Sequence, residues 1–152
     1  MLSVTKTGFW GKGYRIDADG RELTTWDVSF WRSGGDFVLD GHPYRVRTSG
    51  WRNLFTMTDD QERILATATR VGRKRWTVEA GGHTYHFRRQ SFWSGNQELH
   101  DDAGPRGIVR RSGFWQTTIT ADLPTLPPPV QVFVIGVVIT MWNQQAAAAA
   151  AS

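Results

Sequence analysis

Hydrophobic and polar positions alternate along most of this chain, and turn residues interrupt the alternation every few positions. In Tyr44-Arg45-Val46-Arg47 the apolar side chains share one face of an extended strand and the arginines share the other. Tyr85-His86-Phe87-Arg88 repeats this arrangement. Such alternation is typical of a sheet with one face in the core and one in water. Turn signals divide the chain into twelve predicted strands, at residues 2–7, 12–18, 21–30, 35–40, 42–48, 51–58, 62–70, 74–80, 83–89, 92–99, 106–112 and 114–121.

The predicted strands fall into a repeat of about forty residues. Gly41-His42-Pro43-Tyr44 recurs 41 residues later as Gly82-His83-Thr84-Tyr85. Acidic turns recur at nearly the same spacing, in Asp19-Gly20, Asp59-Asp60 and Asp101-Asp102. The repeat predicts three related units of four strands. We expect the paired aspartates to bridge the backbone of their own turns rather than to act as catalytic pairs.

The last apolar run, Val130 to Trp142, has no charge and no polar face, so it must be covered on all sides. Either a bilayer or the inside of the sheet would cover it. As an α-helix the run would span about 20 Å, whereas a bilayer core needs about 20 residues. The length favours the interior of a twelve-stranded barrel, whose bore is too wide for side chains alone. Pro129 suits a first helical turn, but the many β-branched residues leave two further strands as the alternative to a helix.

Composition narrows the function classes without identifying one. The 152 residues suit a single domain, which we expect to cover 1–145, with an alanine-rich tail at 146–152. The absence of cysteine excludes disulfides and thiolate metal sites, and it favours the cytoplasm. We find no catalytic motif and expect neither an enzyme, a metal site nor a cofactor, and we expect a monomer. A formal net charge of +4 permits an anionic partner.

Basic side chains are the remaining candidates for a binding site. Four cluster around one turn (Arg70, Arg73, Lys74 and Arg75), Arg110-Arg111 aligns with that turn one unit later, and others lie on the outer face of related strands. We predict a site for anionic lipid made by Arg45, Arg47, Arg73, Lys74, Arg75 and Arg88. The alternative is that these residues only keep a barrel soluble by pairing with carboxylates.

Nucleic acid is the less favoured partner. Binding to single strands would use exposed aromatic side chains interleaved with arginine. The tryptophans recur once or twice per unit, at Trp10, Trp31, Trp51, Trp76, Trp93 and Trp115, which fits core packing better than an exposed strip.

The aromatic units that end in Arg111-Ser112-Gly113-Phe114-Trp115, together with the proline-rich closing segment from Leu126 to Val134, resemble one known family. They are similar to the LURP-one-related group of the Tubby C-terminal-like superfamily, which also includes phospholipid scramblases. The resemblance covers essentially the whole chain. It implies a closed twelve-stranded antiparallel β-barrel threaded by a hydrophobic C-terminal helix, here residues 130–144, and it favours helix over strand for the apolar run.

For function, the resemblance implies a non-catalytic domain that binds anionic phospholipid head groups at the inner membrane surface. Scramblase activity is not expected, because nothing in the sequence resembles an acidic calcium loop. Two alternatives stay open. One is a protein-interaction scaffold with no lipid role, and the other is a protein anchored in the membrane by its C-terminal apolar segment.

Overall fold

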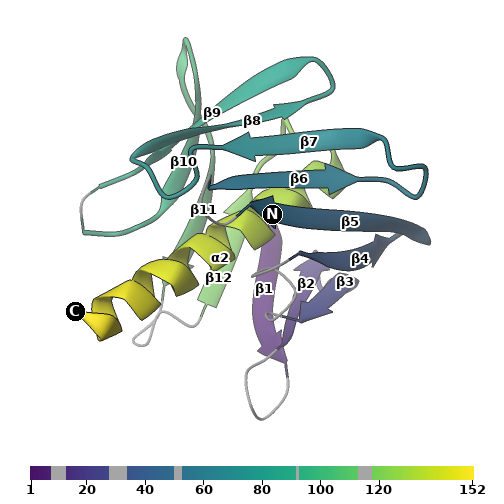
Figure 1. Cartoon of the computed structure of the whole chain (residues 1–152), viewed down its shortest axis with the longest axis horizontal. Coiled ribbons are helices and arrows are strands. Elements are labelled where there is room, and N and C mark those ends of the chain that lie inside the picture. The colour runs from purple at the N-terminus through teal and green to yellow at the C-terminus, as the bar shows by residue number, and fades with distance from the viewer. Residues whose placement is uncertain (8–12, 28–33, 50–52, 92, 113–117) are drawn as a thin grey trace.

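A single antiparallel sheet of twelve strands wraps around one long helix (Figure 1). The computed structural model describes residues 1–7, 13–27, 34–49, 53–91, 93–112 and 118–152. The elements are β1 (Leu2–Thr7), β2 (Gly13–Ala18), β3 (Arg21–Asp27), β4 (Gly35–Leu39), β5 (His42–Ser49), β6 (Leu54–Thr58), β7 (Ile64–Thr69), β8 (Arg75–Ala80), β9 (His83–Arg89), β10 (Gln97–Asp101), β11 (Gly104–Ser112), β12 (Thr118–Asp122) and α2 (Pro128–Ala151). The predicted class, twelve antiparallel strands with a C-terminal helix, is confirmed.

The barrel is nearly closed, and the prediction of full closure was wrong. Hydrogen-bonded pairing runs in the order β3-β2-β1-β12-β11-β10-β9-β8-β7-β6-β5-β4, so β3 and β4 are the two edges. These edges lie side by side without a ladder between them. Gly34, at φ 112°, lies just before β4 and turns the chain out of the extended conformation there. Buried Trp26 and Phe37 fill the core on either side of this seam.

The strand positions follow the prediction closely except at β10. Residues 92–99 were predicted as a strand, but β10 begins only at Gln97. Short-range hydrogen bonds hold the preceding segment in a turn: Ser91 Oγ accepts from the backbone N–H of Ser94 at 3.1 Å, and the Gln90 N–H donates to the Asn96 carbonyl at 2.8 Å. The serine side chain competes with strand pairing in this way.

The predicted forty-residue repeat has a structural counterpart in the β-bulges. Register shifts fall between Ile16 and Asp17 in β2, between Met57 and Thr58 in β6, and between Leu99 and His100 in β10. Each is the second strand of a four-strand unit and lies just before an acidic turn. A bulge bends a strand and increases its twist. Three bulges at matching places therefore help to curve the sheet around the helix.

Helix α2 runs through the middle of the sheet. Pro127 precedes it with extended backbone (φ −61°, ψ 152°), and Gln131 caps the entry by donating from Nε2 to the Leu126 carbonyl at 2.7 Å. Every residue from Val132 to Trp142 is buried, and the hydroxyl of Thr140 donates to the Gly136 carbonyl within the helix at 2.8 Å. The helix was predicted at 130–144, but it continues through the alanines to Ala151. Alanine favours the helical state even where it is exposed.

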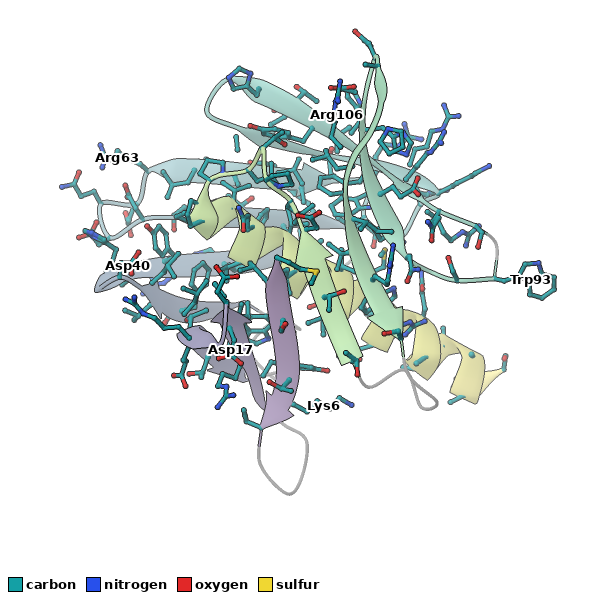
Figure 2. All side chains as sticks on the ribbon, turned by 180° about the vertical axis from the view of Figure 1, so that it is seen from behind. Lys6, Asp17, Asp40, Arg63, Trp93 and Arg106 are labelled. Carbon is teal, nitrogen blue, oxygen red and sulfur yellow. The ribbon has the colours of Figure 1, made fainter. Side chains whose placement is uncertain are left out.

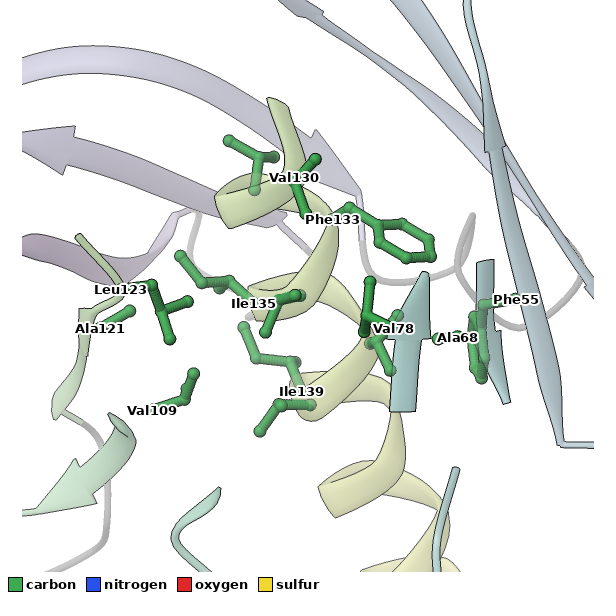
Figure 3. Close-up of a cluster of buried hydrophobic side chains, with 14 of the residues drawn as sticks. Phe55, Ala68, Val78, Val109, Ala121, Leu123, Val130, Phe133, Ile135 and Ile139 are labelled. Carbon is green, nitrogen blue, oxygen red and sulfur yellow. The ribbon is translucent and has the colours of Figure 1, made fainter. Parts of the chain in front are cut away.

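The core consists of α2 and the inward-facing residues of the strands. Figure 3 shows α2 between two walls of the barrel, with Val78, Ala68 and Phe55 on one side and Leu123, Ala121 and Val109 on the other. Small alanines on β7 let the helix approach that strand closely. Burying each valine, isoleucine or phenylalanine contributes about 1.5–3 kcal/mol. This burial outweighs the low helix propensity of the β-branched run.

Helix α2 is long and apolar enough to cross a membrane. In the structure 61% of its most apolar 18-residue window is buried inside the barrel. The same side chains cannot line the core and contact lipid at once. If α2 served as a membrane anchor, it would therefore have to leave the barrel, which would remove the hydrophobic core.

The two ends of the barrel differ, and we name them by the path of the helix. At the entry end β12 finishes at Asp122 and α2 begins. At the exit end α2 emerges beside the β9–β10 connection (90–96) and the β7–β8 turn (70–74). There the Trp142 indole donates to the Gly95 carbonyl at 2.9 Å, and the Arg89 N–H donates to the Lys74 carbonyl at 3.0 Å.

Candidate anion-binding groove

Four of the six predicted lipid-binding residues come together near the exit end. Arg75 on β8 lies directly opposite Arg88 on β9 in the antiparallel ladder. Arg73 and Lys74 lie in the adjoining β7–β8 turn, and all four side chains are exposed. The alternation of β8 and β9 sends Trp76 and Phe87 inward, where their rings stack at 4.5 Å, and so sends the arginines outward.

The β7–β8 turn that carries the basic residues is held in a defined shape. The Arg73 N–H donates to the Arg70 carbonyl at 3.1 Å, which closes the turn. Arg70 and Gly72 both have positive φ, 61° and 92°. Between them Val71 is buried, and its N–H donates to the Asn53 carbonyl at 3.2 Å. This anchoring fixes the direction in which the basic side chains leave the barrel.

A groove of about 510 Å³ runs along the outer face of the sheet beside this turn. Its polar lining consists of Arg70, Arg75, Thr77, His86, Arg88, His100 and Asp101. His86 lies opposite both Thr77 and His100 in the ladder, so hydroxyl and imidazole groups form a row next to the arginine pair. Guanidinium, imidazole and hydroxyl groups are all donors to phosphate and carboxylate oxygens.

The carboxylates near the groove are already engaged. Glu98 bonds His100 Nε2 at 2.7 Å and lies 4.0 Å from Arg88 Nε, while Asp101 pairs with Arg106. Among the described residues, no carboxylate pairs with Arg70 or Arg75. Of the groove's three arginines, Arg88 therefore has a carboxylate partner, while Arg70 and Arg75 have none among the described residues.

Arg45 and Arg47 do not belong to this cluster. They lie on β5, three strands from β8 and thus about 14 Å away across the ladder. Arg45 pairs with Asp36 at 3.3 Å. Both arginines line a different hollow, of about 740 Å³, which also contains the carboxylates of Asp36, Asp59, Asp60 and Glu62. The structure thus separates the predicted residues into a group near the exit end and a charge-balanced group.

Arg110 and Arg111, which align with the β7–β8 turn in sequence, also separate. Arg110 is exposed on β11, whereas the Arg111 guanidinium lies over the Trp142 ring at 4.6 Å from its centroid. The Arg111 Nε atom is buried without a hydrogen-bond partner, and burial lowers the pKa of this side chain. Arg111 therefore packs on the end of the buried part of α2 and takes no part in the groove.

The acidic turns bridge their own backbone, as predicted. Asp59 Oδ1 accepts from the N–H groups of Gln61 and Arg63, each at 2.9 Å. Asp101 Oδ1 accepts from the Ala103 N–H at 2.8 Å, and its other oxygen binds Arg106. The hydrogen bond from Arg106, followed by that from Ala103, lowers the pKa of Asp101 despite opposing desolvation. These aspartates are turn-forming residues.

Within the described part of the chain, no three histidine or acidic side chains gather into a metal site. Of the six tryptophans that the repeat highlights, Trp76 is buried as expected for the core, but Trp93 is 88% exposed. Core packing was the wrong expectation for Trp93. Trp10, Trp31, Trp51 and Trp115 lie outside the described residues.

Comparison with known proteins suggests no family and no function for this groove. No family model, no curated protein sequence and no solved structure matches the chain.

Proposed function

We propose that this chain is a non-catalytic β-barrel of the Tubby-like, LURP-one-related kind that binds anionic phospholipid head groups in the groove of Arg70, Arg75 and Arg88. The observation that carries the proposal is the position of Arg75 directly opposite Arg88, with no carboxylate paired to Arg75 among the described residues. The family resemblance in the aromatic units and the closing segment supports it. The proposed location is the cytoplasmic face of a membrane.

Like charges directly opposite each other on neighbouring strands destabilise a sheet. On one side Arg88 faces Glu98, whose carboxylate lies 4.0 Å from its Nε. On the other side it faces Arg75, and an anion between the two arginines would offset that repulsion. A phosphate group provides that anion, because its oxygens accept parallel hydrogen bonds from planar guanidinium groups. Each basic residue near an anionic membrane surface contributes about 1 kcal/mol to binding.

The row of Thr77, His86 and His100 suits the same ligand. These side chains lie beside the arginine pair on the outer face. His86 adds an exposed imidazole, while the Thr77 hydroxyl already bonds Thr69 and His100 Nε2 already bonds Glu98. They line a shallow open surface and not an enclosed cavity, so the groove fits an exposed head group whose acyl chains stay in the bilayer.

Charge reversal tests this proposal. The variant with Arg75→Glu and Arg88→Glu should lose most binding to vesicles that contain phosphatidylserine. The matched control carries Arg45→Glu and Arg47→Glu, which make the same charge change where carboxylates already surround the arginines. The control should retain binding apart from a modest general electrostatic loss. Equal loss in both variants would show that net charge alone drives association and would refute the groove as the site.

The single change Arg75→Glu gives a second readout of the same pair. Placing a carboxylate opposite Arg88 converts a repulsive cross-strand pair into an attractive one. We expect the free energy of unfolding to rise by about 0.2–1 kcal/mol while vesicle binding falls. A substitution that stabilises the fold and weakens binding separates a functional role from a structural one. A loss of stability would mean that Arg75 contributes to the stability of the fold, and it would argue against a role in ligand binding.

A further inference from the structure

The exit end of the barrel combines an exposed tryptophan with the basic turn. Trp93 lies in the β9–β10 connection, between Arg89 at the end of β9 and Gly95, whose carbonyl accepts the Trp142 indole N–H. Figure 2 shows Trp93 projecting from the side at which α2 emerges, while Arg63 lies on the opposite side. The adjacent β7–β8 turn is joined to β9 through the bond from the Arg89 N–H to the Lys74 carbonyl.

The β9–β10 connection that carries Trp93 contains several hydrogen bonds. A network of hydrogen bonds fixes the segment: Asn96 Nδ2 donates to Gln90 Oε1 at 3.1 Å, and Ser91 Oγ bonds the Ser94 hydroxyl at 3.0 Å. The backbone bond from Gln90 to Asn96 closes its base. Within this connection, Trp93 is a large aromatic residue at 88% exposure. Trp26, Trp76 and Trp142 are by contrast buried in the core.

The sequence repeats the same dipeptide in other segments that join strands at this end. Phe92-Trp93 has counterparts in Phe9-Trp10 between β1 and β2, Phe30-Trp31 between β3 and β4, and Phe114-Trp115 between β11 and β12. These three segments lie outside the described residues. The register places the strand ends that flank them together, since Gly13 pairs with both Thr7 and Asp27, and Ser112 pairs with Thr118.

Charge is distributed unevenly between the two ends. Arg70, Arg73 and Lys74 lie in one exposed turn at the exit end. The hairpin turns of the entry end contain the acidic residues Asp19, Asp40, Asp59, Asp60, Asp101 and Asp102. Two of these aspartates pair with arginines, Asp59 with Arg63 and Asp101 with Arg106, so the entry end has mixed charge. An anionic surface would therefore attract the exit end more strongly than the entry end.

We infer that the exit end docks on an anionic membrane, with the Trp93 indole inserted at the level of the lipid head groups and the basic turn against their phosphates. This inference rests on the proposed function and adds its orientation. Tryptophan concentrates at membrane interfaces because its large apolar ring carries a polar N–H. With Trp93 in the interface, the groove of Arg75 and Arg88 lies close to the head groups, since Arg88 is near the end of β9 that leads into the Trp93 connection.

A membrane fits this surface better than single-stranded nucleic acid. Bases stack on aromatic rings that line a groove or lie flat on a sheet. Trp93 instead projects from the molecule at a connection between strands and does not line the groove, and the rings of Trp76 and Phe87 behind the groove are buried. A projecting side chain can enter a lipid interface but offers no continuous platform to successive bases.

The absence of cysteine makes a site-specific test direct, because any introduced cysteine is unique. Trp93→Cys labelled with an environment-sensitive fluorophore reports on the exit end. Ile64→Cys, at an exposed apolar residue near the entry end, is the matched control. With vesicles containing phosphatidylserine, we expect a blue shift and shielding from aqueous quenchers at position 93 and no change at position 64. Unlabelled Trp93→Ala should weaken vesicle binding roughly tenfold, while Ile64→Ala should not.

The outcomes separate this inference from the proposed function. Vesicle binding that depends on Arg75 and Arg88 but leaves position 93 in water would overturn the docking orientation and leave the groove intact. Shielding at position 64 instead of 93 would also overturn it. No vesicle binding by the unmodified protein, or Trp93-dependent binding to an oligonucleotide in its place, would refute both proposals.

Discussion

At the residue scale, the informative feature is which charged side chains the fold leaves without partners. Arg45 pairs with Asp36, and Asp101 pairs with Arg106, as expected of residues that keep a barrel soluble. Arg75 faces another arginine. Surface ion pairs contribute little individually, so their presence carries little information. Two like charges that face each other on neighbouring strands oppose folding, so a role in solubility alone does not explain why Arg75 faces Arg88.

Sequence reasoning identified Arg88 because alternation places it on the outer face, and Arg75 because it belongs to a cluster of basic residues around one turn. It could not show that they are partners, since register depends on the turn between the strands. It also missed His100, because the predicted strand ended at residue 99 and the bulge at Leu99 and His100 has no clear signal in the sequence. Trp93 was assigned to the core because tryptophan recurs once or twice per unit, and that recurrence does not indicate which way an individual side chain points.

Asp101 provides a prediction about pH. The hydrogen bond from Arg106 holds the pKa of Asp101 below its ordinary value, so the ionised form stabilises the fold above that ordinary value. The contribution is lost as the pH falls through the depressed pKa of the folded state. Asp101→Asn should therefore destabilise the protein at pH 7, and the difference from wild type should disappear in strong acid, as measured by urea unfolding across pH.

Asp102→Asn is the control for this measurement. Asp102 lies in the same turn, and no hydrogen bond to its side chain is found in the described structure. The free energy of unfolding of Asp102→Asn should therefore stay close to that of wild type across the whole pH range. A destabilisation by Asp101→Asn that persisted unchanged at low pH would contradict a role for the carboxylate charge.

At the element scale, α2 shows how tertiary contacts override local propensity. The run from Val130 to Trp142 is rich in β-branched residues, and on propensity alone it would be read as strands. Its length and its lack of a polar face favoured a helix inside a barrel, and the structure contains that helix. The continuation to Ala151 was not anticipated, because the alanines leave the core and low complexity suggested a separate tail.

Substitutions along α2 measure how much the barrel depends on its centre. Ile135 is fully buried, so Ile135→Ala should lower the free energy of unfolding by about 2–5 kcal/mol. Gln145 lies on the same helix but is exposed beyond the barrel, so Gln145→Ala should change it by less than about 0.5 kcal/mol. Chemical denaturation checks both. If Ile135→Ala were neutral, α2 would not form the core of the folded protein.

At the scale of the whole molecule, one unit of four strands is used three times to enclose a helix. The bulges recur at matching positions, and the sheet stops just short of closure between β3 and β4. Alternation and turn spacing were enough to predict the strand number and the architecture, because both depend on local sequence. The open seam and the distinct ends of the barrel depend on how remote segments meet, which local patterns do not specify.

The central claim is that the barrel binds anionic membranes peripherally, with α2 remaining inside. Flotation of the full-length protein with neutral and with phosphatidylserine-containing vesicles, at low and at high salt, tests it most directly. The account predicts binding to the anionic vesicles alone, greatly weakened at high salt because screening acts on exposed charges. Binding to both kinds of vesicle regardless of salt would contradict it, because that result requires an apolar segment such as α2 to enter the bilayer.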